Sequence, residues 1–187
     1  QESPNMHRPL PSVGPIWTIL DLWLVVLLAT PLASYGQDDD FVPVTDAMLQ
    51  DPADGDWLMW RRTLDSWGYS PLDQVNRDNV DQLRMVWSRD LATGTGEGTP
   101  LAYNGILYMP QASDVIQAID AVTGDLLWGY RRPIPEDLYE MVGGNARNNR
   151  NIAIYENKII NTSDDNHIFA LDALTGGLVW ETEILDY

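Results

Sequence analysis

The sequence contains no cysteine among its 187 residues. Disulfide bonds, thiol catalysis, cysteine-type zinc sites and lipid attachment through an N-terminal cysteine are therefore excluded. Basic residues are also scarce, with 11 lysines and arginines against 28 aspartates and glutamates and a formal net charge of −17. This balance argues against a nucleic-acid partner, because nucleic-acid binding needs a basic face.

Phenylalanine is rare, with two residues against eight tryptophans and eight tyrosines. A repeated unit that carries one fixed tryptophan would produce this balance. Hydrophobic residues make up 44% and charged residues 21% of the chain, which excludes disordered and collagen-like classes. A length of 187 residues fits one ordinary domain or a piece of a larger one.

The first 36 residues are predicted to form a targeting segment. Residues 16–28 (IWTILDLWLVVLL) are apolar apart from Thr18 and Asp21, and small residues follow them. Because a membrane-spanning helix needs ~20 apolar residues, the stretch favours a cleaved secretory signal peptide, with a retained membrane anchor at 16–36 as the alternative. Both alternatives export the chain, so we expect a periplasmic location.

An acidic leader, residues 37–55, follows this segment and opens with aspartates at 38–40. Three adjacent carboxylates repel one another and lack the spacing of a calcium loop. We therefore expect this acidic run to be solvated, and we assign residues 56–187 to the folded part of the chain.

A tandem repeat occupies the second half of the chain. Residues 118–128 (AIDAVTGDLLW) and 170–180 (ALDALTGGLVW) are identical at seven of eleven positions and lie 52 residues apart. Short runs of β-branched and aromatic residues surround each copy and alternate with polar turn clusters. Four such runs per copy predict two four-stranded units, at 97–130 and 149–184, and units of this size are typical of β-propeller blades.

Three positions of the repeat carry structural predictions. The tryptophan of the last strand is expected to pack between neighbouring blades, because packing recurs at every blade whereas function seldom does. The aspartate before the Thr-Gly turn is expected to accept hydrogen bonds from the turn amides, and the glycine is expected to have a positive φ. The residues concerned are Trp128 and Trp180, Asp120 and Asp172, and Gly124 and Gly176.

Residues 80–91 (VDQLRMVWSRDL) resemble the last strand of a blade, with Trp87 at the tryptophan position. No earlier strands of such a blade precede them. We therefore predict a closing strand that completes a blade whose other strands come from the far end of the chain and so seals the edge of the ring. Two complete units are fewer than the four that a ring requires, so we expect the sequence to be the N-terminal part of a longer propeller.

The region from about residue 56 to 187 resembles the dehydrogenases that use pyrroloquinoline quinone (PQQ), of the methanol and alcohol dehydrogenase type. The resemblance is carried by DWLMWRRTLDSWGYSPLDQVN (56–76), EGTPLAYNGILY (97–108), NRNIAIY (149–155) and the two A-x-D-A-x-T-G-x-L-x-W units. It implies an all-β, eight-bladed propeller, of which this chain holds about two blades and the closing strand. It also implies PQQ and usually calcium near the propeller axis, an alcohol or sugar substrate, and a cytochrome c or ubiquinone as electron acceptor.

The resemblance also implies cofactor-binding residues. Members of this family hold PQQ partly through a glutamate that enters the first blade and an arginine that follows an asparagine in the next. The matching residues here are Glu97, Asn149 and Arg150, and the 52-residue offset places Glu97 and Asn149 at equivalent points just before the innermost strands. A guanidinium suits bidentate binding of a carboxylated quinone and stabilises its reduced oxygen.

One departure from the family pattern concerns the residues before this arginine. Many alcohol dehydrogenases of the family have two adjacent cysteines there, whereas this chain has Gly143, Gly144 and Asn145. The chain therefore belongs to a cysteine-free branch or has lost the activity. The calcium ligands and the catalytic aspartate of the family lie in later blades, beyond Tyr187, so we expect no catalytic or metal-binding residue in this chain.

Two hypotheses for the function follow. The first is an exported quinoprotein oxidoreductase that in full-length form oxidises an alcohol or sugar through PQQ, with the 187-residue chain inactive by itself. The alternative is a non-enzymatic propeller of the same repeat type that serves as a binding scaffold in the cell envelope. Glu97 and Arg150 at the rim facing the axis favour the enzyme.

Overall fold

The computed structural model describes residues 41–141 and 150–185. The predicted targeting segment, residues 1–36, lies outside the described residues, as does the start of the acidic leader. Within the described part of the chain, no helix is long and apolar enough to cross a membrane.

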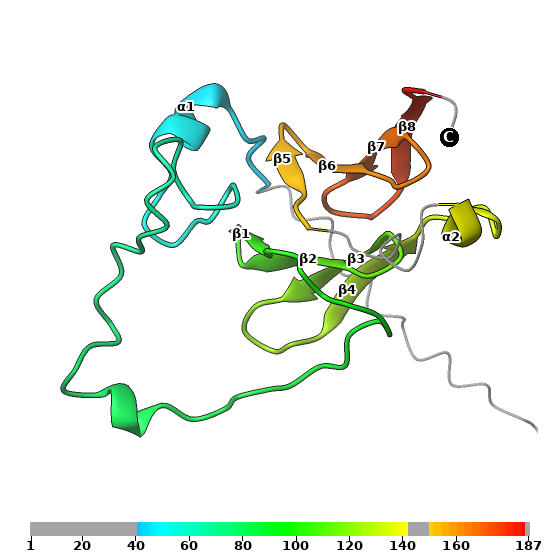
Figure 1. Ribbon diagram of the computed structural model, residues 1–187. Coiled ribbons are helices and arrows are strands. Elements are labelled where there is room, and N and C mark those ends of the chain that lie inside the picture. Colours follow the sequence, from blue (N-terminus) through cyan, green and yellow to red (C-terminus); the bar gives the residue numbers. More distant parts are fainter. Residues whose placement is uncertain (1–40, 142–149, 186–187) are drawn as a thin grey trace, which may run out of the picture. The chain divides into compact units, whose positions relative to one another are not determined.

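Two four-stranded antiparallel sheets, each a simple meander, form the repeat region (Figure 1). In both sheets each strand pairs with the next strand in sequence. The register also repeats, since Ile106 faces Asp120 in the first sheet and Lys158 faces Asp172 in the second. The two predicted four-stranded units and the all-β class are therefore confirmed. The first sheet contains β1 (Leu101–Tyr103), β2 (Ile106–Gln111), β3 (Val115–Asp120) and β4 (Leu126–Arg131), and the second contains β5 (Ala153–Tyr155), β6 (Lys158–Thr162), β7 (His167–Asp172) and β8 (Leu178–Glu183).

The turn between the third and fourth strands of each sheet is held by an aspartate side chain. Asp120 Oδ1 accepts hydrogen bonds from the backbone N–H groups of Val122 and Thr123, at 2.8 and 2.7 Å. Asp172 Oδ1 accepts the equivalent bonds in the second sheet, at 3.1 and 2.9 Å. These bonds tie up turn amides that the strands leave free, so the aspartates act on the backbone and not on a ligand.

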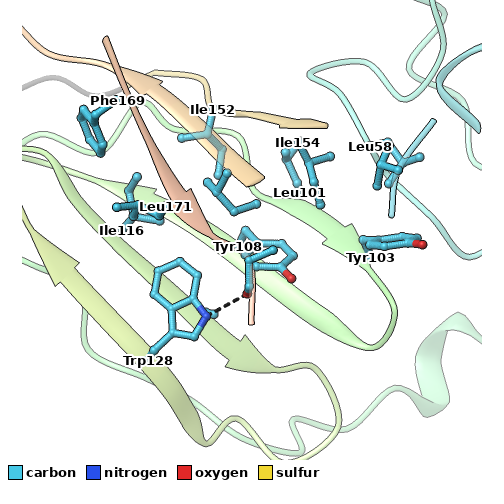
Figure 2. Packing of buried hydrophobic residues seen from close by; sticks show 14 residues of the cluster. Leu58, Leu101, Tyr103, Tyr108, Ile116, Trp128, Ile152, Ile154, Phe169 and Leu171 are labelled. Atoms are coloured by element: carbon cyan, nitrogen blue, oxygen red, sulfur yellow. Dashed lines mark hydrogen bonds between the residues drawn. The ribbon is translucent and has the colours of Figure 1, made fainter. Parts of the chain in front are cut away.

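The tryptophan of β4 packs on the corresponding turn of the second sheet. The indole Nε1 of Trp128 donates to the carbonyl of Ala173 at 2.9 Å, and 8% of the residue is exposed (Figure 2). A Cβ on Gly176, which has φ +70°, would lie 2.6 Å from the Trp128 ring. The glycine is therefore needed twice, for the left-handed backbone and for the close approach of the indole.

Trp180 occupies the same position in β8 but is 37% exposed. In the described chain no further turn of this kind lies against it. The difference from Trp128 shows that burial of this tryptophan depends on the sheet that follows it.

Residues 80–91, the predicted closing strand, have no strand partner among the described residues. They begin with a 3-10 helix, η1 (Val80–Gln82), and the described residues after it up to residue 91 are not in a strand. A strand needs a neighbouring backbone to pair with, and the predicted partners of this segment are strands from the far end of a longer chain. Trp87 nevertheless docks as a blade tryptophan does, since its Nε1 donates to the Ala121 carbonyl at 3.2 Å and its ring lies on Gly124.

An N-terminal strap, residues 41–62, runs along the inner strands of both sheets. Val44 forms two backbone hydrogen bonds with Glu156, just after β5, and Trp57 forms two with Ala102 in β1. Within the strap lies the short helix α1 (Asp46–Gln50). The folded part therefore begins before the predicted residue 56, because Val44 pairs with the backbone of the second sheet and its side chain is buried in the core. The chain between the two sheets contains a second short helix, α2 (Leu138–Met141).

The hydrophobic core lies where the first sheet meets the second and extends under the strap (Figure 2). Aromatic rings contribute much of the packing: the centroids of Tyr130 and Phe169 are 5.6 Å apart, and those of Tyr108 and Trp128 are 6.1 Å apart. The most deeply buried side chains include Tyr108, Phe169, Leu58, Leu101, Ile116 and Ile159.

Substitution of Gly176 tests the tryptophan contact. Gly105, in the β1–β2 turn, has a similar φ of +74°, but an added Cβ there meets no atom within 4 Å. In the protein made from the complete gene, Gly105→Ala should lower the free energy of unfolding by ~1 kcal/mol through backbone strain alone. Gly176→Ala should cost a further ~1–3 kcal/mol, because the methyl group displaces the indole. Denaturant unfolding compares the two variants, and equal losses would show that the indole contact is unimportant.

Candidate functional site

The segments that lead into the inner strands place Glu97 and Arg150 together. Glu97 precedes β1 by four residues and Arg150 precedes β5 by three. The N–H of Thr99 donates to the Arg150 carbonyl at 2.9 Å, and Thr99 forms a parallel bridge with Asn151. The two lead-in segments therefore lie side by side, although more than fifty residues separate them in sequence.

An ion pair joins the two side chains. Arg150 Nε lies 2.7 Å from Glu97 Oε2, and the side chains are 70% and 41% exposed. The structure thus brings together two of the three residues that sequence reasoning selected, at a position open to solvent. Asn149, the third, lies outside the described residues, as do Gly143, Gly144 and Asn145.

The geometry of this pair is compatible with an anionic ligand. The bond to Glu97 engages Nε, and a guanidinium also has two terminal nitrogens that can bind a carboxylate in bidentate fashion. Glu97 limits the orientations of the Arg150 side chain. Within the described residues, no group of three or more acidic or histidine side chains could hold a metal ion.

A second charged cluster, here called the inter-sheet clamp, is buried between the two sheets. Arg132, just after β4, bonds to Asp165 Oδ2 at 2.5 Å and to Glu181 Oε1, with its Nε at 3.0 Å from that oxygen. It also donates to the Ser163 hydroxyl at 3.3 Å, and this hydroxyl donates to Asp114 of the first sheet. Arg132 is 6% exposed, Asp114 5% and Asp165 2%.

The clamp changes the acidity of its two buried aspartates in opposite directions. Burial raises the pKa of Asp114 to about 6, because the hydrogen bond from Ser163 and the charge of Arg132 offset only part of the lost hydration. Burial also disfavours the charged form of Asp165. There, however, hydrogen bonds from Ser163 and Arg132 outweigh burial and hold the pKa below its usual range.

Sequence reasoning did not select any residue of the clamp. The turns that contain Asp114 and Asp165 were predicted, but aspartate is common in turns and gives no further signal. Arg132 follows another arginine at the end of a strand, where an exposed charge is the ordinary expectation. Its partners lie 33 and 49 residues further along the chain, and no local pattern indicates such pairs.

A family model described as the β-propeller domain of glucose, ethanol and alcohol dehydrogenases that use PQQ matches residues 57–183. The chain belongs to this family. The match begins at Trp57 of the strap and includes both sheets, the two lead-in segments and the inter-sheet clamp.

Named relatives agree with this assignment. The dehydrogenase subunit of a quinone-dependent alcohol dehydrogenase from Gluconacetobacter polyoxogenes is 39% identical over 132 residues, which cover 70% of this chain and 18% of that protein. A quinohemoprotein alcohol dehydrogenase, ADH IIB of Pseudomonas putida, is 32% identical over 166 residues, 87% of this chain and 23% of that protein. The sequence therefore spans about a fifth of the length of these relatives.

Solved structures of the family share the fold. The quinohemoprotein alcohol dehydrogenase ADHIIG from Pseudomonas putida HK5 superimposes with a TM-score of 0.66 at 31% identity, over 78% of this chain and 22% of that one. A europium-containing methanol dehydrogenase gives a TM-score of 0.65 at 30% identity, over 72% of this chain and 24% of that one. The two sheets described here are therefore propeller blades.

The two arginines should differ in their effect on stability. Arg132→Met in the complete protein should lower the free energy of unfolding by about 3 kcal/mol or more, because it leaves the buried charge of Asp165 without its cation. Arg150→Gln removes an exposed pair and should cost less than ~1 kcal/mol. Denaturant unfolding at pH 7.5 measures both, and equal losses would contradict the contrast between a buried and an exposed ion pair.

Proposed function

We propose that the complete protein is an exported PQQ-dependent dehydrogenase that oxidises an alcohol or a related polyol. The observation that carries the proposal is the solvent-accessible Glu97–Arg150 ion pair, formed by the lead-in segments of adjacent blades in a chain of this family. Export rests on the hydrophobic segment at residues 16–28 and implies a periplasmic location.

Arg150 would hold PQQ through one of its carboxylates. Its guanidinium is accessible, and its terminal nitrogens have the fork geometry that a carboxylate needs. Glu97 would position this guanidinium through Nε, and Asn149 would contribute from the adjacent position in the chain. When bound, PQQ supplies the group that accepts two electrons from the substrate.

The metal ion and the electron acceptor are assigned by chemical class. Calcium, or a lanthanide as in the europium-containing methanol dehydrogenase, would be bound by residues outside the described part of the chain. The acceptor would be a cytochrome c or ubiquinone. Relatives named for each class exist: a quinone-type alcohol dehydrogenase subunit, and a cytochrome c-dependent 1-butanol dehydrogenase from Thauera butanivorans that is 38% identical over 121 residues.

A non-enzymatic envelope scaffold is the alternative function. The observation that favours it is the Gly143–Gly144–Asn145 sequence, where many alcohol dehydrogenases of the family have adjacent cysteines. A scaffold of this kind would keep the blades and the tryptophan contacts without binding PQQ.

The test is PQQ binding and turnover by the protein made from the complete gene in the periplasm. With PQQ and calcium supplied, dye reduction should follow the addition of primary alcohols. Arg150→Gln should raise the dissociation constant of PQQ at least ~10-fold, because it removes a charge-assisted bond, while Arg150→Lys should recover part of the loss. Arg77→Gln, at an exposed position in the segment before the first sheet, is the matched control and should bind as the wild type does.

The outcomes separate the two candidate functions. PQQ binding that the Arg150→Gln variant weakens, together with alcohol-dependent turnover, supports the dehydrogenase. A folded protein that binds no PQQ and reduces no dye with calcium or a lanthanide would overturn it in favour of the scaffold. Binding that is equally strong in Arg150→Gln and Arg77→Gln would refute the role of Arg150.

A further inference from the structure

The inter-sheet clamp lies at the same end of the sheets as the Glu97–Arg150 pair. Leu101, at the start of β1, faces Tyr108 near the end of β2. The lead-in segment that holds Glu97 and the turn that holds Asp114 therefore lie at one end of the first sheet. The same antiparallel pairing in the second sheet, where Ala153 faces Ile160, places the segment of Arg150 at the end that carries Asp165.

The clamp contains more negative than positive charge. Arg132 bonds directly to the carboxylates of Asp165 and Glu181. Its contact with Asp114 is a backbone hydrogen bond, from the Arg132 N–H to the Asp114 carbonyl at 3.4 Å. The Asp114 carboxyl group is bonded instead by the Ser163 hydroxyl, a neutral donor, and is buried. One guanidinium therefore faces three carboxyl groups, and Asp114 is the one that it does not bond through its side chain.

We propose that the inter-sheet clamp is a pH-dependent contact between the two blades. Asp114 takes up a proton in mildly acidic solution, and this protonation stabilises the contact. Protonation of Asp114 reduces the excess negative charge around Arg132 and leaves the two carboxylates that Arg132 bonds directly. The neutral carboxyl group still accepts the hydrogen bond from Ser163, so the contact between the sheets keeps its geometry.

The direction of the pH dependence follows from the raised pKa. The pKa of Asp114 is about 6 in the folded chain, against 3.8 for an ordinary aspartate. The folded state therefore binds the proton more tightly than the unfolded state does. The resulting stability is fully present below pH 3.8 and is lost as the pH rises through 6.

The other ionisable groups around Asp114 and Arg132 do not reverse this direction. Burial, followed by the charge of Asp165, raises the pKa of Asp164, so this group also favours the protonated form. Burial raises the pKa of the Tyr130 phenol, which stays neutral in this range. His167 has Nδ1 3.3 Å from Asp165 and Nε2 3.9 Å from Glu181, so it faces the two carboxylates that Arg132 bonds and not Asp114.

Asp114→Asn isolates the carboxyl group of Asp114. Asparagine has the same shape, accepts the Ser163 hydrogen bond and tolerates the φ of +51° at this position. In the complete protein, the melting temperature of Asp114→Asn should exceed that of the wild type by at least about 2 °C at pH 7.5. The difference should narrow as the pH falls through 6 and disappear only near pH 3.8. Asp54→Asn, at an exposed position of the strap, is the control and should follow the wild type throughout.

Ser163→Ala gives a second, independent measurement. The hydroxyl stabilises the ionised form of Asp114, so its removal should move the midpoint of the pH-dependent change in melting temperature to higher pH. An unchanged midpoint would contradict the proposal, as would a difference between Asp114→Asn and the wild type that is the same at every pH. These measurements follow unfolding and not turnover, so their result is independent of the proposed dehydrogenase activity.

Discussion

The contact between the Trp128 indole and the turn of the next sheet is the interaction on which the rest of this structure depends. A four-stranded antiparallel sheet with one exposed face cannot bury its apolar side chains alone, so it needs a neighbour at a defined distance and angle. The indole sets both, because its Nε1 bonds to the Ala173 carbonyl while its ring lies on Gly176. Trp87 makes the same contact with the turn of the first sheet, so the rule holds at two successive junctions.

The position of the candidate site follows from that contact. Once the two sheets are stacked, their inner strands start at neighbouring points, and the lead-in segments pair through Thr99 and Arg150. Glu97 and Arg150 then form an ion pair, although they are far apart in sequence and no interaction between neighbouring residues brings them together. The strap strengthens the arrangement, since Val44 pairs with the residue after β5 while Trp57 pairs with β1.

The two ion-pair systems at this end of the sheets have different physical characters. The Glu97–Arg150 pair is exposed, so it contributes little to stability and its arginine is available to a ligand. The clamp around Arg132 is buried, so its charges are costly to leave unpaired. Burial raises the pKa of Asp114, a member of the clamp, and so opposes its ionisation. This titration links the contact between the blades to pH.

The sequence by itself determined the features that repeat or that depend on neighbouring residues. These include the two four-stranded units, the aspartate-capped turns, the glycines with positive φ and the tryptophan positions, because strand alternation and turn chemistry act over a few residues. Only the tertiary structure decided that Trp87 packs on the turn of the first sheet although its segment has no strand partner among the described residues. It also decided that Arg132 is buried, because its partners come from the other sheet and local sequence is the same for a buried and an exposed arginine.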